Sequence, residues 1–449
     1  MFIPSRREIL KIGVRSLASF GALSAMGKLG EMNALASGSP NYKALVCIFL
    51  FGGNDPHNTV VPINTPLQTY ANYQAVRQSL ALAQGSLLPI TTKNGAVYGL
   101  HPKMPELQAL YQQNRVALLA NTGMLVQPTT RALYQAQAVP VPANLFSHSD
   151  QQDQWQTSFA NNLTTTGWAG RAADINQAQN GQPPYPMVMT PSSCGLFCSG
   201  AHTYGTVAPP GNPSGLLGMN LVGKQTGFQQ LLNFDNGLTL VQATNTVTKR
   251  GVADSTLLAS ALASTTPLQT VFPNSNIGAQ LKQVASIINV RASLGLSKQI
   301  FFASLDGFDT HGGQLPTHDA LLQQLSQAMS AFYTATVEMG AAPQVITFTN
   351  SEFGRTLQPS SGGGSDHAWG GHQMIMGGGV VGGDLYGTYP LLALNTGDDA
   401  NTRGVMIPTT SVDQYGATLA SWFGVNAVDL PTLFPNLQNF ATKNLGFLG

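Results

Sequence analysis

Two short segments in the second half of the chain combine histidine with aspartate at spacings that suit a metal ion. Asp309 and His311 stand two residues apart in DGFDTH, and on a loop both side chains can reach one ion. Asp366, His367 and His372 follow in DHAWGGH, where the glycines let the backbone fold tightly around a site. Imidazole together with carboxylate is a donor set for a borderline divalent metal such as zinc or manganese. The two segments therefore predict a metal centre.

Three further segments carry groups that could take part in chemistry at such a centre. Asp55 follows an apolar run in GGND, and Glu352 and Arg355 lie together in NSEFGRT. The guanidinium of Arg355 suits an oxyanion, and it equally suits an ion pair with a nearby carboxylate. Ser147 stands beside His148 in FSHSD, but adjacent residues rarely face each other, so a Ser–His pair is not expected. Ser147 is then either a hydroxyl activated by a metal or the cap of a helix.

Apolar runs that alternate with amphipathic stretches place most of these groups after strands. We expect strands at Lys43–Phe51, Val116–Ala120, Pro186–Thr190, Gln299–Leu305 and Gln344–Thr349, and one beginning at Met374–Met376. We expect helices at Met104–Asn114, Ile277–Leu294, Leu315–Met339 and Val412–Phe423, the last capped by Thr410 or Ser411. We expect His318 on a helix surface. This alternation predicts a mostly parallel sheet covered on both faces, whose ligands collect at the carboxyl ends of the strands.

Composition narrows the classes of function. The 21 basic and 20 acidic residues nearly balance, which gives no basic face for nucleic acid. Hydrophobic residues make up 43% of the chain, enough for a large core, and we expect residues 41–449 to form one α/β domain with the Gly/Pro/Ser-rich stretch 191–275 as an insertion or cap. Cys47 lies in an apolar run and is expected in the core, whereas Cys194 and Cys198 could pair in an oxidising compartment.

The N-terminus predicts export. Arg6 and Arg7 lie in SRREILK, which matches the twin-arginine pattern, and a mildly apolar stretch follows at Ser16–Met26. Ala34–Ala36 offers a small-x-small cleavage site. We therefore expect residues 1–36 to be a signal peptide read by the twin-arginine translocase, and the mature protein, which has no apolar run long enough for a membrane span, to be periplasmic or secreted.

Seven segments together resemble domain-of-unknown-function family 1501, whose members are exported proteins assigned to the alkaline phosphatase–sulfatase superfamily. They lie between about residue 44 and residue 425 and read FLFGGNDPHNTVVP, LFSHSDQQDQWQ, TGWAGRAAD, DGFDTHGGQ, TNSEFGRT, DHAWGGHQMIMGGGVVGG and IPTTSVDQYGATLASWFGV. The resemblance implies a three-layer αβα sandwich that is alkaline-phosphatase-like. It also implies hydrolysis of phosphate or sulfate esters, in which two metals flank a Ser or Thr nucleophile.

The resemblance assigns roles to several of the candidate residues. Asp55 resembles the metal ligand that follows the first strand, and Ser147 is the candidate for the nucleophile. Asp309, His311 and His372 resemble the ligands of one ion.

The sequence offers fewer candidate ligands for the second ion. Glu352 stands where the superfamily usually has the Asp of an Asp-His pair, but the following residue is Phe353, which cannot bind a metal. Asp366 or His367 would have to complete this second site.

Three functions fit the sequence. The first is an exported hydrolase of small-molecule or polysaccharide esters that uses one or two divalent ions (zinc, manganese or calcium), with Arg355 or Asn58 holding the non-bridging oxygens. The second is a non-catalytic exported protein with a degenerate metal site, which binds an envelope polysaccharide or a protein. The third is a metal-free serine hydrolase, which needs a histidine and an acid positioned on Ser147.

Overall fold

The structure is a computed structural model that describes most of the chain after the expected signal. The expected signal peptide at residues 1–36 lies outside the described residues, and so does Cys194 of the expected Cys194–Cys198 pair. The residues described are 41–449 apart from 162–163, 178–179, 181–184, 194, 212–221 and 235–236.

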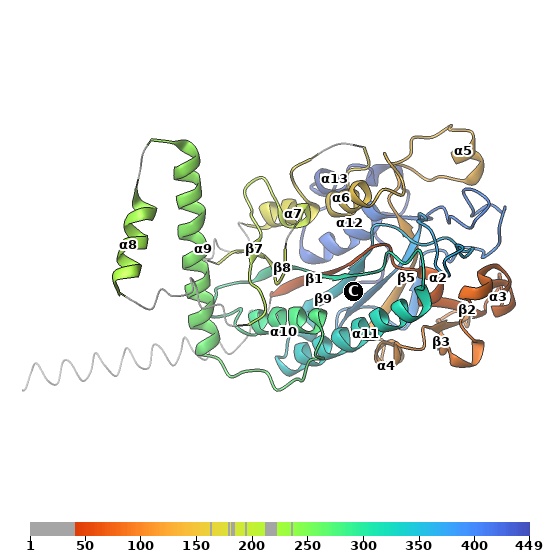
Figure 1. The fold of residues 1–449 in the computed structure, drawn as a ribbon, viewed down its shortest axis with the longest axis horizontal. Coiled ribbons are helices and arrows are strands. Elements are labelled where there is room, and N and C mark those ends of the chain that lie inside the picture. Colours follow the sequence, from red (N-terminus) through yellow and green to blue (C-terminus); the bar gives the residue numbers. More distant parts are fainter. Residues whose placement is uncertain are drawn as a thin grey trace, which may run out of the picture.

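A nine-stranded sheet forms the centre of the molecule (Figure 1). Its strand order is β11-β5-β10-β9-β1-β8-β6-β7, with β12 beside β5. All neighbouring strands are parallel except β10, which is antiparallel to both β5 and β9. The strands are β1 (Lys43–Phe51), β5 (Val116–Gly123), β6 (Val188–Thr190), β7 (Thr206–Val207), β8 (Lys298–Asp306), β9 (Val345–Asn350), β10 (Gly371–Gly377), β11 (Asp384–Tyr386) and β12 (Thr410–Ser411).

Helices cover both faces of this sheet because its strands are apolar on both sides. In β1, Val46 and Ile48 enter one core cluster, while Leu45 and Cys47 enter the other. The first cluster is covered by α4 (Pro105–Gln112), α10 (Asn276–Asn289) and α11 (Gln314–Glu338). The second is covered by α6 (His148–Thr157), α7 (Trp168–Asn176), α12 (Val412–Phe423) and α13 (Leu430–Leu433). The expected three-layer αβα arrangement with a mostly parallel sheet is confirmed.

Smaller elements surround this frame. A second sheet has the order β2-β4-β3, built from β2 (Val60–Asn64), β4 (Val97–Leu100) and β3 (Leu88–Thr91), which the sequence did not predict. Short helices are α2 (Pro56–Thr59), α3 (Tyr70–Arg77) and α5 (Arg131–Gln135). Single 3-10 turns are η1 (Gln78–Leu80), η2 (Gln84–Ser86), η4 (Leu196–Cys198), η5 (Ala342–Gln344) and η6 (Leu437–Asn439).

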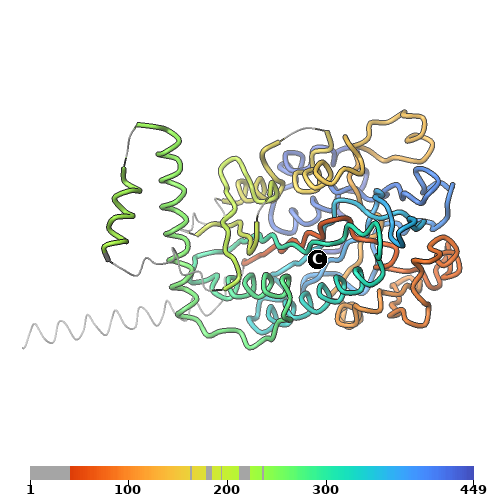
Figure 2. Tube along the Cα trace, viewed as in Figure 1, coloured from red at the N-terminus to blue at the C-terminus, as the bar shows by residue number. Residues whose placement is uncertain are grey.

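The stretch expected as an insertion carries two helices that stand away from the sheet, α8 (Val222–Asn233) and α9 (Thr239–Ala263) (Figure 2). Helix α9 has 25 residues and is a long element in a stretch for which we expected only an insertion or cap. Its C-terminal turns reach the core, where Leu258 and Ala261 are buried. None of the helices in the described part of the chain combines the length and the apolar character that a membrane crossing requires.

The predicted elements agree with the structure, with few differences. All six predicted strands are present, Ser411 caps α12 through a hydrogen bond from Asp413 N, and Cys47 is a buried free thiol. The helix expected to run to Leu294 ends at Asn289. The surface position expected for His318 is wrong: its side chain is 1% exposed, and its Nε2 lies 2.9 Å from Asn54 Oδ1.

Candidate metal centre

Four segments that are far apart in the sequence meet at the carboxyl edge of the central sheet. Two of them directly follow β8 and β9, and a third is the start of α6. The fourth, residues 366–370, precedes β10, and because β10 runs antiparallel to β9 its first residues lie at the edge where β9 ends. The reversed strand is therefore what brings the DHAWGG segment to the same edge as DGFDTH.

Two glycines after β1 allow these segments to pack closely. Gly52 has a φ of +112°, and a Cβ built on it would lie 2.3 Å from Asp309 N. Gly53 has a φ of +84°, and its Cβ would lie 2.5 Å from the ring of Phe353. A side chain at either position would push the loop after β8 or the loop after β9 away from the edge. The GG of GGND is thus required by the geometry of the site.

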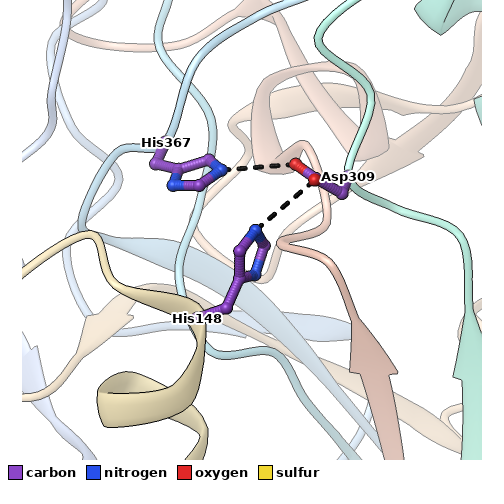
Figure 3. A group of neighbouring side chains, drawn as sticks. All are labelled: His148, Asp309 and His367. Atoms are coloured by element: carbon purple, nitrogen blue, oxygen red, sulfur yellow. Dashed lines mark hydrogen bonds and ion pairs between the residues drawn. The ribbon is translucent and has the colours of Figure 1, made fainter.

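Three side chains converge on one point, as Figure 3 shows. His148, Asp309 and His367 each offer one ligand atom, and these atoms lie within 4.8 Å of one another. Nε2 of His148 lies 3.5 Å from Asp309 Oδ2, and Nε2 of His367 lies 3.2 Å from Asp309 Oδ1. Two imidazoles and a carboxylate form a donor set that suits zinc or a similar divalent ion.

His311 adjoins this group on its solvent side. Its Nε2 lies 3.1 Å from Asp309 Oδ1 and 3.0 Å from His367 Nε2. Its Nδ1 lies 3.1 Å from Asp366 Oδ1, and the other oxygen of Asp366 accepts a hydrogen bond from Arg403. His311 is therefore a candidate for a fourth ligand.

The loop of Gly362–Gly364 packs against the backbone that carries His311. Gly312 forms bridges with Gly362 and Gly363, and a Cβ on Gly364 would lie 2.2 Å from the carbonyl oxygen of Thr310. This close packing fixes the position of the DTH segment.

Hydrogen bonds on the far side of two rings direct the remaining nitrogens towards Asp309. Nδ1 of His367 donates to the carbonyl of Phe146 at 2.8 Å, and Nδ1 of His148 donates to Oε1 of Glu352 at 3.0 Å. In each ring Nδ1 carries a proton, and Nε2 is the nitrogen that faces the carboxylate and could bind a metal once its own proton is released.

Glu352 holds His148 from inside the protein. Its side chain is completely buried, and Oε1 also accepts from Gly52 N at 2.7 Å and from Gln152 Nε2 at 3.1 Å. The other oxygen, Oε2, has no hydrogen-bond partner. Glu352, expected as a metal ligand, therefore lies behind His148, which presents its own Nε2 to the group.

Arg355 is buried and makes contacts to four carbonyls and one carboxylate. It donates to the carbonyls of Gly53, Gly52, Phe308 and Ser365, and to Asp309 Oδ1 at 2.7 Å. With its donors engaged inside the protein, Arg355 fixes the loop and the carboxylate of Asp309. Burial by itself raises the pKa of Asp309, but the hydrogen bond and charge of Arg355, with help from His367 and His148, lower this pKa to about 2. Asp309 is therefore ionised and ready to bind a cation.

Asp55 and His372 lie in a different, buried group. Asp55 caps α2 by accepting from His57 N at 3.0 Å, and its other oxygen binds Arg77 and Gln314. Nδ1 of His372 accepts from Asn121 N at 3.0 Å, and its Nε2 is buried without a partner. Neither residue belongs to the converging group.

Ser147 occupies the N-cap position of α6, directly before His148. Its hydroxyl donates to Asp150 Oδ2 at 2.5 Å and lies 3.3 Å from Ser149 Oγ. Both partners belong to the first turn of the helix, and the hydroxyl is not turned towards a histidine.

His148 is the candidate ligand that reasoning from the sequence did not select, although it stands in the FSHSD segment. Its ring lies 4.9 Å from the ring of Phe353, which stacks on His367 at 4.4 Å. His148 thus approaches the group next to the position where a histidine at 353 would stand. In the sequence, the only sign of its role was a histidine directly after the N-cap of a helix. Only the packing of this helix, α6, brings the histidine to the loop that follows β8.

Comparisons with known proteins agree with the family resemblance. A family model described as "Protein of unknown function (DUF1501)" matches residues 242–411. No curated protein matches the chain.

Among solved structures, a phosphonate monoester hydrolase from Silicibacter pomeroyi aligns with 88% of this chain and 77% of its own, at 9% identity and a TM-score of 0.37. A phosphonate monoester hydrolase of Agrobacterium radiobacter aligns with 88% and 77%, at 10% identity and a TM-score of 0.32. A sulfatase from Pseudoalteromonas sp. aligns with 80% and 66%, at 8% identity and a TM-score of 0.31.

Proposed function

We propose that the protein is an exported, metal-dependent hydrolase of phosphate or sulfate esters. The observation that carries the proposal is the convergence of His148, Asp309 and His367 at the carboxyl edge of the sheet. Their two Nε2 atoms and the ionised carboxylate fit a divalent ion, and His311 stands beside them as a candidate for a fourth ligand. Zinc is the first candidate because two imidazoles favour it over calcium.

The chain's own groups prepare this centre. A bound divalent ion would act as a Lewis acid on an ester oxygen. Glu352 fixes the ring of His148, Phe146 fixes the ring of His367, and Arg355 keeps Asp309 ionised and in place. These contacts preorganise the ligands, so that little reorganisation is needed on binding.

Ser147 stays the proposed nucleophile. It is the hydroxyl next to ligand His148, and Asp150 already accepts its hydrogen bond. To attack an ester, the hydroxyl has to rotate from Asp150 towards the centre.

Metal analysis tests the proposal. We expect near-stoichiometric zinc or manganese in the purified protein, and its loss in the His148→Ala/His367→Ala double variant. His202→Ala removes an exposed histidine outside the group and should keep the metal. A wild-type protein that takes up no metal even after soaking, or a double variant that retains it, would overturn the proposal. A screen with phosphate, phosphonate and sulfate monoesters then follows on the loaded protein.

The His372→Asn variant tests whether His372 binds the metal, as the resemblance implied, or lies apart from the metal ligands, as the geometry indicates. Asparagine can still accept the hydrogen bond of Asn121 N, so the fold should persist. We expect the variant to keep its metal because His372 lies outside the converging group. Loss of the metal with an intact fold would place His372 among the ligands instead.

One observation favours a second function, a binding protein with a degenerate centre. Phe353 is 1% exposed and stacks on His367, where the superfamily usually has a metal-binding histidine. A metal-loaded protein that hydrolyses none of the esters in the screen would support this second function.

Export by the twin-arginine translocase to the periplasm or beyond is part of the proposal and is supported by SRREILK alone. Replacing Arg6 and Arg7 with lysine should keep the precursor in the cytoplasm. Fractionation of cells that express the tagged full chain measures this, and unchanged export of the Arg6→Lys/Arg7→Lys variant would exclude the route.

A further inference from the structure

A cavity of about 600 Å³ lies beside the candidate metal centre, between α5 and residues 137–146. Its volume falls within the roughly 300–1,000 Å³ of small-molecule sites. Tyr134, Gln137, Val141 and Phe146 are among the residues that line it.

The cavity and the metal centre share Phe146. The residue lines the cavity, and its carbonyl accepts the hydrogen bond that orients His367. The cavity and the centre are therefore neighbours that share this residue.

The wall of the cavity is held in an unusual conformation. Gln137, Asn144 and Phe146 have φ values of 52°, 48° and 74°, in the left-handed region that residues other than glycine rarely adopt. The wall is also tied to the helix that carries His148, because Phe146 N donates to Gln151 Oε1 at 2.6 Å and Asn144 Nδ2 donates to Asp150 Oδ1 at 2.8 Å. Strained backbone of this kind is common at ligand-binding walls, where the surrounding structure holds it.

The chemistry of the lining selects the kind of ligand. No residue that lines the cavity carries a formal charge, in contrast to the neighbouring centre with its carboxylates and guanidinium groups. The lining combines two aromatic residues, Tyr134 and Phe146, with aliphatic side chains and amides that include Gln137 and Asn144. Tyr134 is set by its packing on Trp369, with the ring centroids 5.5 Å apart. An aromatic face beside amide donors and acceptors fits a molecule with apolar C–H faces and hydroxyl groups.

We propose that this cavity binds an uncharged sugar ring, which forms the alcohol part of the phosphate or sulfate ester. The inference rests on the proposed hydrolase function and adds its substrate class. The charged ester group would bind at Asp309 and its histidines, and the neutral ring would lie against Tyr134 and the amides. A cavity without charge disfavours alcohols that carry a second anionic group, because nothing in its lining would neutralise them.

Binding of neutral sugars to the mature protein without metal tests the cavity separately from catalysis. Methyl β-glucoside and cellobiose are titrated by NMR in the presence of a chelator, with hexanol as an apolar probe of similar size. We expect a dissociation constant on the order of 1 mM for the sugars. Val141→Trp fills the cavity and Gln137→Ala removes an exposed amide, and each should weaken binding at least tenfold. Val428→Trp, the same change at a valine that is 84% exposed elsewhere, should not.

Kinetics of the metal-loaded protein provide a second test. In Val141→Trp, the KM for glucose 6-phosphate or 6-sulfate should rise at least tenfold, while kcat and KM for the methyl esters stay unchanged. If the protein binds sugars but takes up no metal and hydrolyses no ester, the hydrolase proposal is wrong and the cavity remains a sugar site. Metal-dependent hydrolysis of methyl esters without sugar binding, or binding of hexanol alone, would remove the sugar proposal and keep the hydrolase.

Discussion

Single residues at the centre divide into those that can touch a metal and those that hold them in place. Glu352 belongs to the second kind, since its bonds to Gly52 N, Gln152 and His148 leave it behind the imidazole. Sequence reasoning had placed it among the ligands because carboxylates are common ligands and the resemblance pointed the same way. In the structure, Glu352 instead binds His148 of α6, and these two residues are about 200 positions apart in the sequence.

Glu352→Gln should weaken metal binding by roughly 10- to 100-fold, the usual effect of losing a group that orients a histidine ligand. The amide keeps the volume of the side chain but loses the charge that favours the Nδ1–H form of His148. Titration with a zinc-competing dye measures the affinity. The same change at Glu338, which lies on the surface at the end of α11, serves as the control. Equal affinities of the Glu352 variant and the wild type would show that His148 needs no orientation.

Ser147→Ala tests the proposed nucleophile. We expect kcat for a phosphate or sulfate ester to fall by roughly a hundredfold or more, with the metal content unchanged, because the hydroxyl contacts no ligand. Ser149→Ala, one position beyond His148, is the matched control. Full activity of Ser147→Ala would mean that water attacks directly and that Ser147 only caps α6.

The site was predictable from sequence where its ligands stand next to strands. Asp309 and His311 were expected on one ion, and Asp366 or His367 on a second, whereas in the structure the four side chains lie together. Asp55 has the same residue type and also follows a strand, yet its partners are Arg77 and Gln314, and no local pattern reveals such distant partners.

At the scale of elements, burial pattern and composition decided what could be predicted. The apolar runs of β1, β8 and β9 are buried on both faces, and such runs are unambiguous. Strands β2, β3 and β4 have only four or five residues and include proline or glycine, so they carry no clear pattern.

Helix α9 was missed for a related reason. Its sequence is rich in threonine, and the hydroxyls of Thr244, Thr246 and Thr248 each donate to the carbonyl four residues earlier. The hydroxyls are thus satisfied within the helix, but threonine has a low helix propensity, so composition did not predict a helix of this length.

The turn after β1 gives a prediction at this scale. Gly53→Ala should lower the free energy of unfolding by more than Gly95→Ala, although the φ values of +84° and +87° impose similar backbone strain of about 1–3 kcal/mol. The difference is the ring of Phe353, 2.5 Å from the added Cβ at position 53, whereas nothing lies within 4 Å at position 95. Urea denaturation of both variants measures it. The Gly53 variant should also bind metal more weakly, since Phe353 supports His367.

If both variants lose the same stability, the loop after β9 yields easily and Gly53 is required only for its φ. That result would leave the metal centre independent of the GG turn, contrary to the packing described above.

The whole molecule keeps four of its eight histidines inside. His57, His101, His318 and His372 are at most 5% exposed. Burial lowers the pKa to about 3 for the first three and to about 4 for His372. In the unfolded chain the same groups titrate near 6.5, so below that pH the unfolded state binds more protons than the folded state. Stability is therefore complete above pH 6.5 and falls as the pH drops towards 4.

One buried carboxyl acts in the opposite sense. Burial raises the pKa of Asp413 to about 7, so the folded state holds a proton that the unfolded state has released above pH 4. This group makes the protein more stable on the acid side, but it offsets only one of the four imidazoles. The net prediction is a loss of stability on acidification, measured by urea denaturation between pH 4.5 and 8 with a chelator present, because metal binding is itself pH-dependent.

A single variant identifies the source of this slope. His318→Gln removes one buried imidazole, so the dependence of the unfolding free energy on pH below 6 should be shallower by about 1.4 kcal/mol per pH unit. His202→Gln removes an exposed histidine and should leave the slope as it is. A slope unchanged by His318→Gln would mean that His318 takes up its proton inside the folded protein, which in turn requires an acceptor for its Nδ1. In the structure that nitrogen is buried without a partner, so the interior offers no such acceptor and the shallower curve is the expected result.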